Sequence, residues 1–482
     1  MTHAADLARS FPPATPADWR ILVEKTLKDQ PLESLHRTTV EGLPIAPLYG
    51  PGGVPAATFT PRPHDAERPW DVRAQISHPD PLQANSDLLS ELEGGAASAL
   101  LRIDPTGAGG IAIGSAEGLA QVLDGVVLEF APVALDAGFL GPRAADWLAA
   151  AAKGSPTALL HFHLDPLSAF AEAGASPGPV EAHLVSAATV ASRLADIHPK
   201  AGLFLASGRV VHEAGGGEAL ELAFAVAAAV TYAKALVRAG LSMDQAWSGI
   251  TLGLSADADY FVTLAKLRAA RVVWDRLTAA CGVEPPACIE ARSSRRMLTA
   301  QDAWTNMLRL SAAAVGAALG GADAVVLGAF SDPLGYPTAF ARRQSRNAQL
   351  VLMEEAHLGR VTDPAAGAGY VEALSDEIAR AAWAEFQAIE AGGGLIEALA
   401  QGRVAEGVAK AMAAREAAGK PRIVGVTAFP PAQPAEIEVE TPMASPVDAP
   451  APRLPGPDGR CPPLRPIRLA EPYETAPAEA TR

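Results

Sequence analysis

Hydrophobic spacing between residues 302 and 394 alternates between helix-like and strand-like segments. Apolar residues recur at helical spacing over 304–315, and Gly320-Gly321 is expected to end that helix. Residues 324–330 then form an uninterrupted apolar run, which is typical of a strand buried on both faces. A second helix is expected from about 338 to 357. This order of helix, buried strand and helix favours a parallel α/β fold.

The same pattern extends over most of the chain. Eight apolar runs are predicted as strands, near Ala99–Ile103, Val126–Phe130, Ala158–His163, Leu203–Ala206, Ile250–Leu254, Cys288–Ala291, Ala324–Phe330 and Arg360–Thr362. Helical patterns such as Glu218–Arg238 and Asp257–Ala280 separate most of them. Eight parallel strands with intervening helices predict a (β/α)8 TIM barrel over residues 71–392. Periodicity alone leaves a doubly wound open sheet as an alternative.

Different patterns flank the barrel. Residues 1–70 are predicted to be an extended N-terminal arm, with a helix from Pro16 to about Asp29 and then six prolines between 44 and 63. Such an arm is expected to lie on another surface, its own or a partner's. Residues 393–429 are predicted as a helical extension. The tail, 430–482, holds fourteen prolines and is expected to be linker-like or draped over a neighbouring surface.

Composition narrows the classes of function. The formal net charge is −15, which argues against nucleic acid as a partner because a basic face supplies most of that binding energy. The three cysteines show no metal-ligand spacing and make no complete disulfide set. The sequence predicts no secretion signal and no membrane-spanning segment. We therefore expect a cytoplasmic protein that binds no metal, nucleic acid or membrane.

Several longer segments carry a specific resemblance. They are Glu41–Gly50, Ala265–Trp274, Gly320–Val325, Ala341–Gly367 and Tyr370–Glu372. Together they closely resemble the acyl-CoA-binding barrel of the coenzyme B12-dependent mutases, above all methylmalonyl-CoA mutase. The resemblance spans most of the chain. It implies a TIM barrel rather than an open sheet.

Two contact positions depart from the family pattern. Catalytic barrels place a tyrosine in Trp-x-x-Arg-Gln-Tyr, whereas this chain has Gln75 at that position, after Trp70 and Arg73. They also place a histidine in Ser-Gly-Tyr-His, and here Val210 takes its place. His212 would share a face with Val210 if the segment were a strand, and a shifted register would then let it substitute.

A third segment also differs. The family's Arg-Thr-His-x-Gln-Thr-Ser-Gly appears here as a shorter basic run that contains Arg292, Arg295 and Arg296. These guanidinium groups suit CoA phosphates, although an intersubunit or solvated patch is slightly favoured. The candidate substrate or CoA-binding residues are thus Arg73, His212, Arg292 and Arg295.

The cobalamin-binding signature Asp-x-His-x-x-Gly has one imperfect counterpart. Asp196–Ala201 contains His198 but places alanine where glycine is required, and it lies within the barrel. We expect His198 to be a solvated loop histidine and the cobalamin domain to be absent. This chain alone is then expected to bind no cofactor.

The altered positions resemble the small (beta) subunits of heterodimeric methylmalonyl-CoA mutases, an isomerase of propionate metabolism. This resemblance implies a non-catalytic chain beside a large (alpha) subunit that converts succinyl-CoA to (R)-methylmalonyl-CoA with adenosylcobalamin. Bulky residues such as Leu100, Leu101, Leu203, Phe204 and Leu205 favour a barrel whose axis is filled. Two alternatives stay open. One is an acyl-CoA-binding barrel of a split mutase with cobalamin on a separate chain, and the other is a non-enzymatic decayed paralogue.

Overall fold

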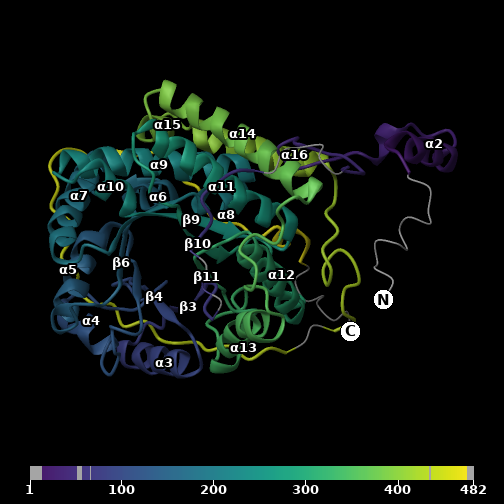
Figure 1. Ribbon diagram of the computed structural model, residues 1–482. Helices are drawn as coiled ribbons and strands as arrows, with labels where there is room; N and C mark the ends of the chain where they lie inside the picture. Colours follow the sequence, from purple (N-terminus) through teal and green to yellow (C-terminus); the bar gives the residue numbers. More distant parts are fainter. Residues whose placement is uncertain (1–13, 51–56, 64, 66, 434–435, 475–482) are drawn as a thin grey trace, which may run out of the picture.

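The computed structural model describes residues 14–50, 57–63, 65, 67–433 and 436–474, and it has a closed parallel barrel at its centre (Figure 1). The strands neighbour one another in the order β10-β11-β3-β4-β5-β6-β8-β9. Their bounds are β3 Asp71–Ile76, β4 Ser98–Arg102, β5 Val133–Asp136, β6 Leu160–Leu164, β8 Gly202–Ser207, β9 Ile250–Ala256, β10 Cys288–Ser293 and β11 Ala324–Val326. The predicted (β/α)8 barrel is confirmed, and the open sheet is excluded.

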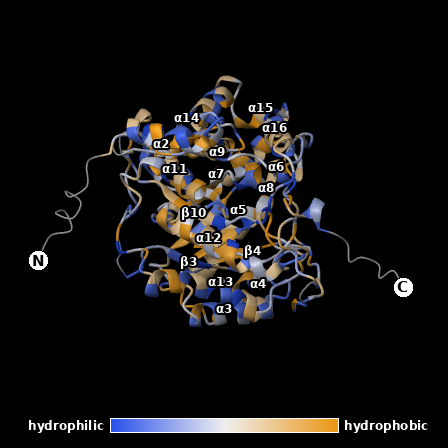
Figure 2. Ribbon diagram, turned by 90° about the vertical axis from the view of Figure 1, so that its right-hand side faces the viewer, coloured by the Kyte–Doolittle hydropathy of each residue, from blue (hydrophilic) through white to orange (hydrophobic). Residues whose placement is uncertain are grey.

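Helices surround this barrel and form a further layer over one side. Those packed around the strands include α3 Pro81–Glu93, α4 Ala116–Val122, α5 Gly141–Ala151, α6 Pro166–Ala173, α7 Val180–Ile197, α9 Glu218–Arg238, α11 Tyr260–Ala280, α12 Asn306–Leu319 and α13 Ala339–Leu350. Outside α9 and α11 lies α14 (Gly369–Ala391), followed by α15 (Leu395–Ala400) and α16 (Arg403–Ala417) (Figure 1). The main hydrophobic core fills the space between the strands and these helices (Figure 2).

Two of the eight predicted strands are wrong. Residues 126–130 form a turn in which Phe130 is 81% exposed, and the strand begins only after Pro132. A continuous apolar run does not reveal which of its parts pairs with the neighbouring strand. The run at 360–362 is a bend. The missing strand is β3, whose alternating polar residues face the inside of the barrel, where the prediction expected apolar ones.

Part of the N-terminal arm lies on its own barrel. The carboxylate of Glu41 accepts hydrogen bonds from the backbone amides of Ala219 and Leu220, at 2.9 and 3.1 Å, and so caps the N-terminus of α9. Further along the arm, Arg62 is buried and donates to the carbonyl of Ala322. The arm therefore caps the N-terminus of α9 and also contacts the barrel at Ala322.

The first described helix behaves differently. Helix α2 (Pro16–Leu27) begins at a capping box formed by Thr15 and Asp18, in agreement with the predicted start. None of its residues is buried, and it projects away from the barrel (Figure 1). Ile21 and Leu22 are both 64% exposed, so this helix presents an apolar surface that its own barrel does not cover.

The proline-rich tail lies along the barrel instead of folding separately (Figure 1). Strand β12 (Gly459–Arg460) pairs antiparallel with β7 (Ala175–Ser176). Further on, the amide of Leu464 donates to Ala171, and the amide of Ile467 donates to Glu213. Backbone hydrogen bonds thus hold the tail against the barrel, although its sequence lacks the hydrophobic periodicity of a packed helix or strand.

Helix α9 is long and apolar enough to cross a membrane by composition alone. In this fold it is packed between the strands β8 and β9 and the outer helix α14, and most of its residues are buried. Its apolar character is therefore that of a core helix.

We predict that Glu41→Ala lowers the free energy of unfolding by about 1 kcal/mol, because two amides at the N-terminus of α9 lose their capping partner. Chemical denaturation followed by circular dichroism measures this change. Glu24→Ala, on the projecting helix α2, is the control and should leave the unfolding midpoint unchanged. Equal midpoints for all three proteins would contradict the capping role.

Candidate functional site

A large cavity lies at the carboxyl ends of the barrel strands, where TIM barrels carry their active sites. Its volume is about 1140 Å³. Five of the positions singled out in the sequence line it, namely Arg73, Gln75, Val210, Arg292 and Arg295. His212, the remaining candidate, is not among the described residues that line this cavity.

A chain of ion pairs crosses the barrel beneath the cavity. Nη1 of Arg73 lies 2.6 Å from one carboxylate oxygen of Glu290, and Nε of Arg292 lies 2.6 Å from the other. Arg292 also reaches Asp136 with Nη1, at 2.8 Å. Because these residues come from β3, β10 and β5, the network ties together strands that are not neighbours in the sheet.

The charges in this network hold one another in the ionised state. Burial alone would raise the pKa of Glu290, but the charges of Arg292 and Arg73 lower it well below its usual range. The pKa of Arg292 is raised, because Glu290 and Asp136 outweigh the cost of burial. His163, in contrast, has its pKa lowered to about 4 by burial, so its imidazole is neutral near pH 7. A neutral ring therefore faces a fully charged network.

Polar side chains, more than bulky ones, fill the axis. Leu100 lies inside the barrel in a small apolar cluster with Ala134 and Val326. Leu101 and Phe204 belong instead to the core between strands and helices. The expectation of a filled axis is thus met mainly by arginine and glutamate, and only in small part by the bulky residues named for it.

Val210 lies on a short helix, not on a strand. Strand β8 ends at Ser207, and Gly208 leads directly into α8 (Arg209–Glu213). A side chain at Gly208 would collide with the backbone carbonyl of Glu221, so the turn requires glycine. The proposed strand register for His212 is wrong, because residues two apart on a helix point in different directions.

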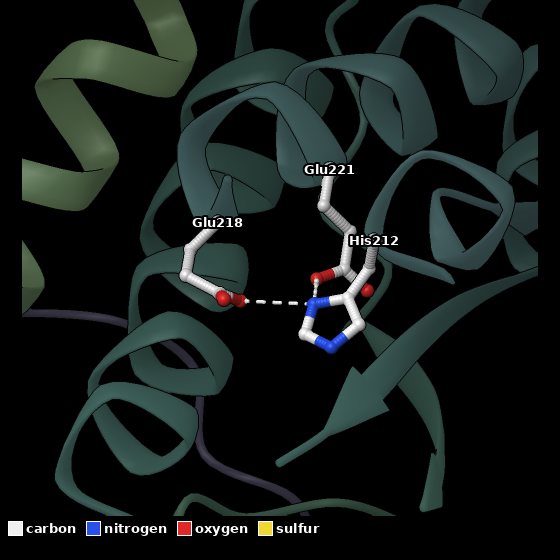
Figure 3. Close-up of side chains that lie close together, drawn as sticks. All are labelled: His212, Glu218 and Glu221. Atoms are coloured by element: carbon white, nitrogen blue, oxygen red, sulfur yellow. Dashed lines mark ion pairs between the residues drawn. The ribbon is translucent and has the colours of Figure 1, made fainter. Parts of the chain in front are cut away.

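His212 is fully buried, and Figure 3 shows its ring beside the carboxylates of Glu218 and Glu221. Its Nδ1 lies 3.2 Å from Glu221 and 3.5 Å from Glu218, both on α9. Its Nε2 lies 3.2 Å from Asp257 and 3.0 Å from the hydroxyl of Ser294. Burial and Arg296 disfavour the imidazolium, but these carboxylates prevail and raise the pKa of His212 to about 10.

His212, Glu218 and Glu221 are close enough together to hold a metal ion. Their carboxylates are already neutralised, however, since Nζ of Lys266 lies 2.5 Å from both Glu218 and Glu221. Arg296 contacts Glu218 as well. With three cations facing three carboxylates, the cluster is a complete ion-pair network and needs no metal to balance its charge.

The basic run begins on β10 with Arg292 and continues just after this strand, and its side chains lie in two environments. Arg292 and Arg296 are each only 4% exposed, so the reading of these residues as a solvated patch is wrong for both. Arg295 is exposed and lines the cavity mouth. One short segment thus contributes to three places. Arg292 belongs to the axial network, Arg296 to the cluster around His212, and Arg295 to the rim of the cavity.

Comparison with known proteins agrees with this architecture. The family model for methylmalonyl-CoA mutase matches residues 66–449. The chain belongs to the methylmalonyl-CoA mutase family. It is 36% identical to "Methylmalonyl-CoA mutase small subunit" of Streptomyces virginiae, over 91% of this chain and 74% of that protein. The protein of the same name from Propionibacterium freudenreichii subsp. shermanii is 34% identical, over 82% of this chain and 64% of its own length.

A more distant relative, "Methylmalonyl-CoA mutase" of Escherichia coli K12, is 27% identical over 86% of this chain and 64% of its own length. This chain thus spans between 64% and 74% of the length of these three relatives.

The family implies cobalamin, so His198 has to be tested as a cobalt ligand. It follows the last residue of α7, is only 8% exposed, and lies with its ring 6.2 Å from that of Phe162. This imidazole is buried at the end of α7, so the expectation of a solvated loop histidine is wrong, and a buried ring is poorly placed to meet a corrin. Among the described residues, this counterpart of the family signature therefore does not fit the cofactor.

Sequence analysis missed several residues of the cavity and its floor. They are Arg102, Asp136, His163, Arg209 and Glu290. The sequence held one usable signal, which is that Glu290 and Arg292 alternate on a strand and so point to the same side.

We predict that Glu290→Gln lowers the free energy of unfolding by about 3–5 kcal/mol, because Arg73 and Arg292 would remain buried without their shared anion. Urea denaturation gives this value. Asp376→Asn removes an exposed partner of Arg380 on α14 and should cost less than about 0.5 kcal/mol. A loss for Glu290→Gln no larger than that of the control would contradict the role of the network.

We also predict that stability falls as the pH rises from about 6.5 to 10. The folded protein holds His212 with a raised pKa, so its contribution is complete below the unfolded pKa and is lost on passing the folded one. His212→Gln should remove this part of the profile, and His36→Gln, at an exposed position, should retain it. Denaturation midpoints measured across this range provide the test. A profile unchanged by His212→Gln would refute the assignment.

Proposed function

We propose that this chain is the small, non-catalytic subunit of a heterodimeric methylmalonyl-CoA mutase. In this assignment the large-subunit partner interconverts succinyl-CoA and (R)-methylmalonyl-CoA with adenosylcobalamin. The small subunit acts as a structural partner and would be inactive alone. The setting is the cytoplasm, as expected for a metabolic enzyme of this type.

The axial ion-pair network is the observation that carries the proposal. An acyl-CoA chain threaded along the barrel would have to displace Arg73, Glu290 and Arg292, each almost completely buried. Breaking such a network is costly, because the remaining charges would stay in a low-dielectric interior. This barrel is therefore built to be filled by its own side chains.

The cavity above the network supports the same conclusion. Gln75 and Val210 line it at the positions where the family resemblance expects a tyrosine and a histidine. A valine has no group that can donate to a thioester oxygen. A rearrangement of this kind needs its migrating fragment held by hydrogen-bond donors. The altered lining therefore favours a scaffold over a catalyst.

The projecting helix α2 supports a partner. Its exposed Ile21 and Leu22 are both apolar, and no part of the described barrel covers them. Burial of such a surface against another subunit contributes binding free energy in proportion to its area. We therefore assign α2 to the contact with the large subunit.

We expect the full chain to co-elute with a mutase large subunit when the two are co-expressed, and turnover of methylmalonyl-CoA to require that partner. Replacing both Ile21 and Leu22 by Asp should abolish co-elution without changing the thermal unfolding of the barrel. Val185→Asp, which alters an equally exposed apolar residue on α7, is the control and should leave co-elution intact.

Turnover of methylmalonyl-CoA by the purified chain alone would refute a non-catalytic role. Activity on mixing with a separate cobalamin-binding protein, without a large subunit, would favour the split-mutase alternative. Absence of any complex with a large subunit would favour a decayed paralogue.

A further inference from the structure

The cavity at the barrel mouth is lined by barrel residues at its floor and by tail residues on the opposite side. Its floor is formed in part by Arg73, Arg292 and His163, above the point where the axis is filled. Tail residues, including Glu440 and residues 464–466, line its other side. The tail therefore helps to enclose this space.

Two guanidinium groups in this cavity have hydrogen-bond donors without partners. Nη2 of Arg292 is buried and donates to no described residue, although Nε and Nη1 of the same side chain are paired. Nε of Arg209 is likewise buried without an acceptor. Its Nη2 lies 3.8 Å from Glu213, which is beyond hydrogen-bonding distance.

An imidazole completes the arrangement. His163 is 4% exposed and lines the cavity, yet neither ring nitrogen has a hydrogen-bond partner. The nearest carboxylate, that of Glu290, lies 3.9 Å from Nδ1. Buried polar atoms are almost always satisfied in folded proteins, and a group of unpartnered donors in one cavity indicates a missing acceptor.

The charges around the floor indicate the sign of that acceptor. Arg292, Arg102 and Arg209 all act on the single carboxylate of Asp136 and lower its pKa. Arg102 forms no ion pair within the described part of the chain. Arg209 has its pKa lowered by burial and by Arg292, and Glu213, Asp136 and Glu290 offset this only in part. Arg292, in contrast, is compensated by Glu290 and Asp136, so a further negative charge would be favourable beside Arg209.

We propose that the cavity floor is a binding site for a small anion with a carboxylate or phosphate group, held by Arg292 and Arg209 beside His163. Guanidinium groups match the planar geometry of such oxygens and bind them through charge-assisted hydrogen bonds. This proposal does not depend on the assignment as a mutase subunit. The barrel would then have its own ligand site, and the bound anion would not be the substrate of a reaction in this chain.

The test uses the purified full chain, or its complex if a partner co-elutes, with inorganic phosphate and malonate as probes. Sodium chloride is exchanged for each probe at constant ionic strength. Saturable binding in calorimetry and a rise in the unfolding temperature are expected. Arg209→Gln should weaken binding about tenfold or more, because one charge-assisted contact is lost. His163→Gln, which removes a second floor group, should also weaken it.

Arg380→Gln, at an exposed arginine on α14, is the matched control and should bind the probes as the unaltered protein does. Equal binding by Arg209→Gln and Arg380→Gln would overturn the site. So would a lack of saturable binding by either probe. Coenzyme A is tested separately. If it binds while phosphate and malonate do not, the cavity is a coenzyme site and the small-anion proposal fails.

Discussion

The carboxylate of Glu290 lies between two arginines inside the barrel, and the organisation of the axis depends on it. A closed barrel of eight strands leaves an interior that side chains must fill. Here Arg73 approaches from β3 and Arg292 from β10 itself, and Asp136 extends the chain of charges to β5. Each charge is tolerated because its neighbours compensate it. The network therefore works as a unit and cannot be opened one residue at a time.

This constraint links the fold to the function. In a barrel with small axial residues, a long ligand can enter along the axis, whereas here the space is occupied by groups that must stay paired. The cavity opens at the mouth, where Gln75 and Val210 line it, and its lining also includes Val72 and Ala96 near the amino ends of β3 and β4. The family scaffold is kept while its interior differs at these positions, which supports the proposed structural role.

The sequence predicted the barrel well and the site only in part. Helix α9 was predicted with the observed bounds, because apolar periodicity reflects burial on the outside of the strands. Strand β3 was missed, since its polar residues face an interior that the prediction assumed to be apolar. The positions Gln75 and Val210 were found through the family pattern. Glu290 and His163 had no such pattern, and their importance depends on three-dimensional pairing between distant strands.

The charged cluster around His212 and the one at the cavity floor differ in how their side chains are paired, which indicates a structural role for the first and a binding role for the second. Around His212, three cations face three carboxylates, and Lys266 bridges both glutamates of α9. The charges of that network balance one another, and it holds α8, α9 and α11 together. At the cavity floor, by contrast, Arg292 and Arg209 retain donors without acceptors. Since both clusters belong to one fold and are similarly buried, the incomplete one calls for an explanation. A solute anion would satisfy these donors.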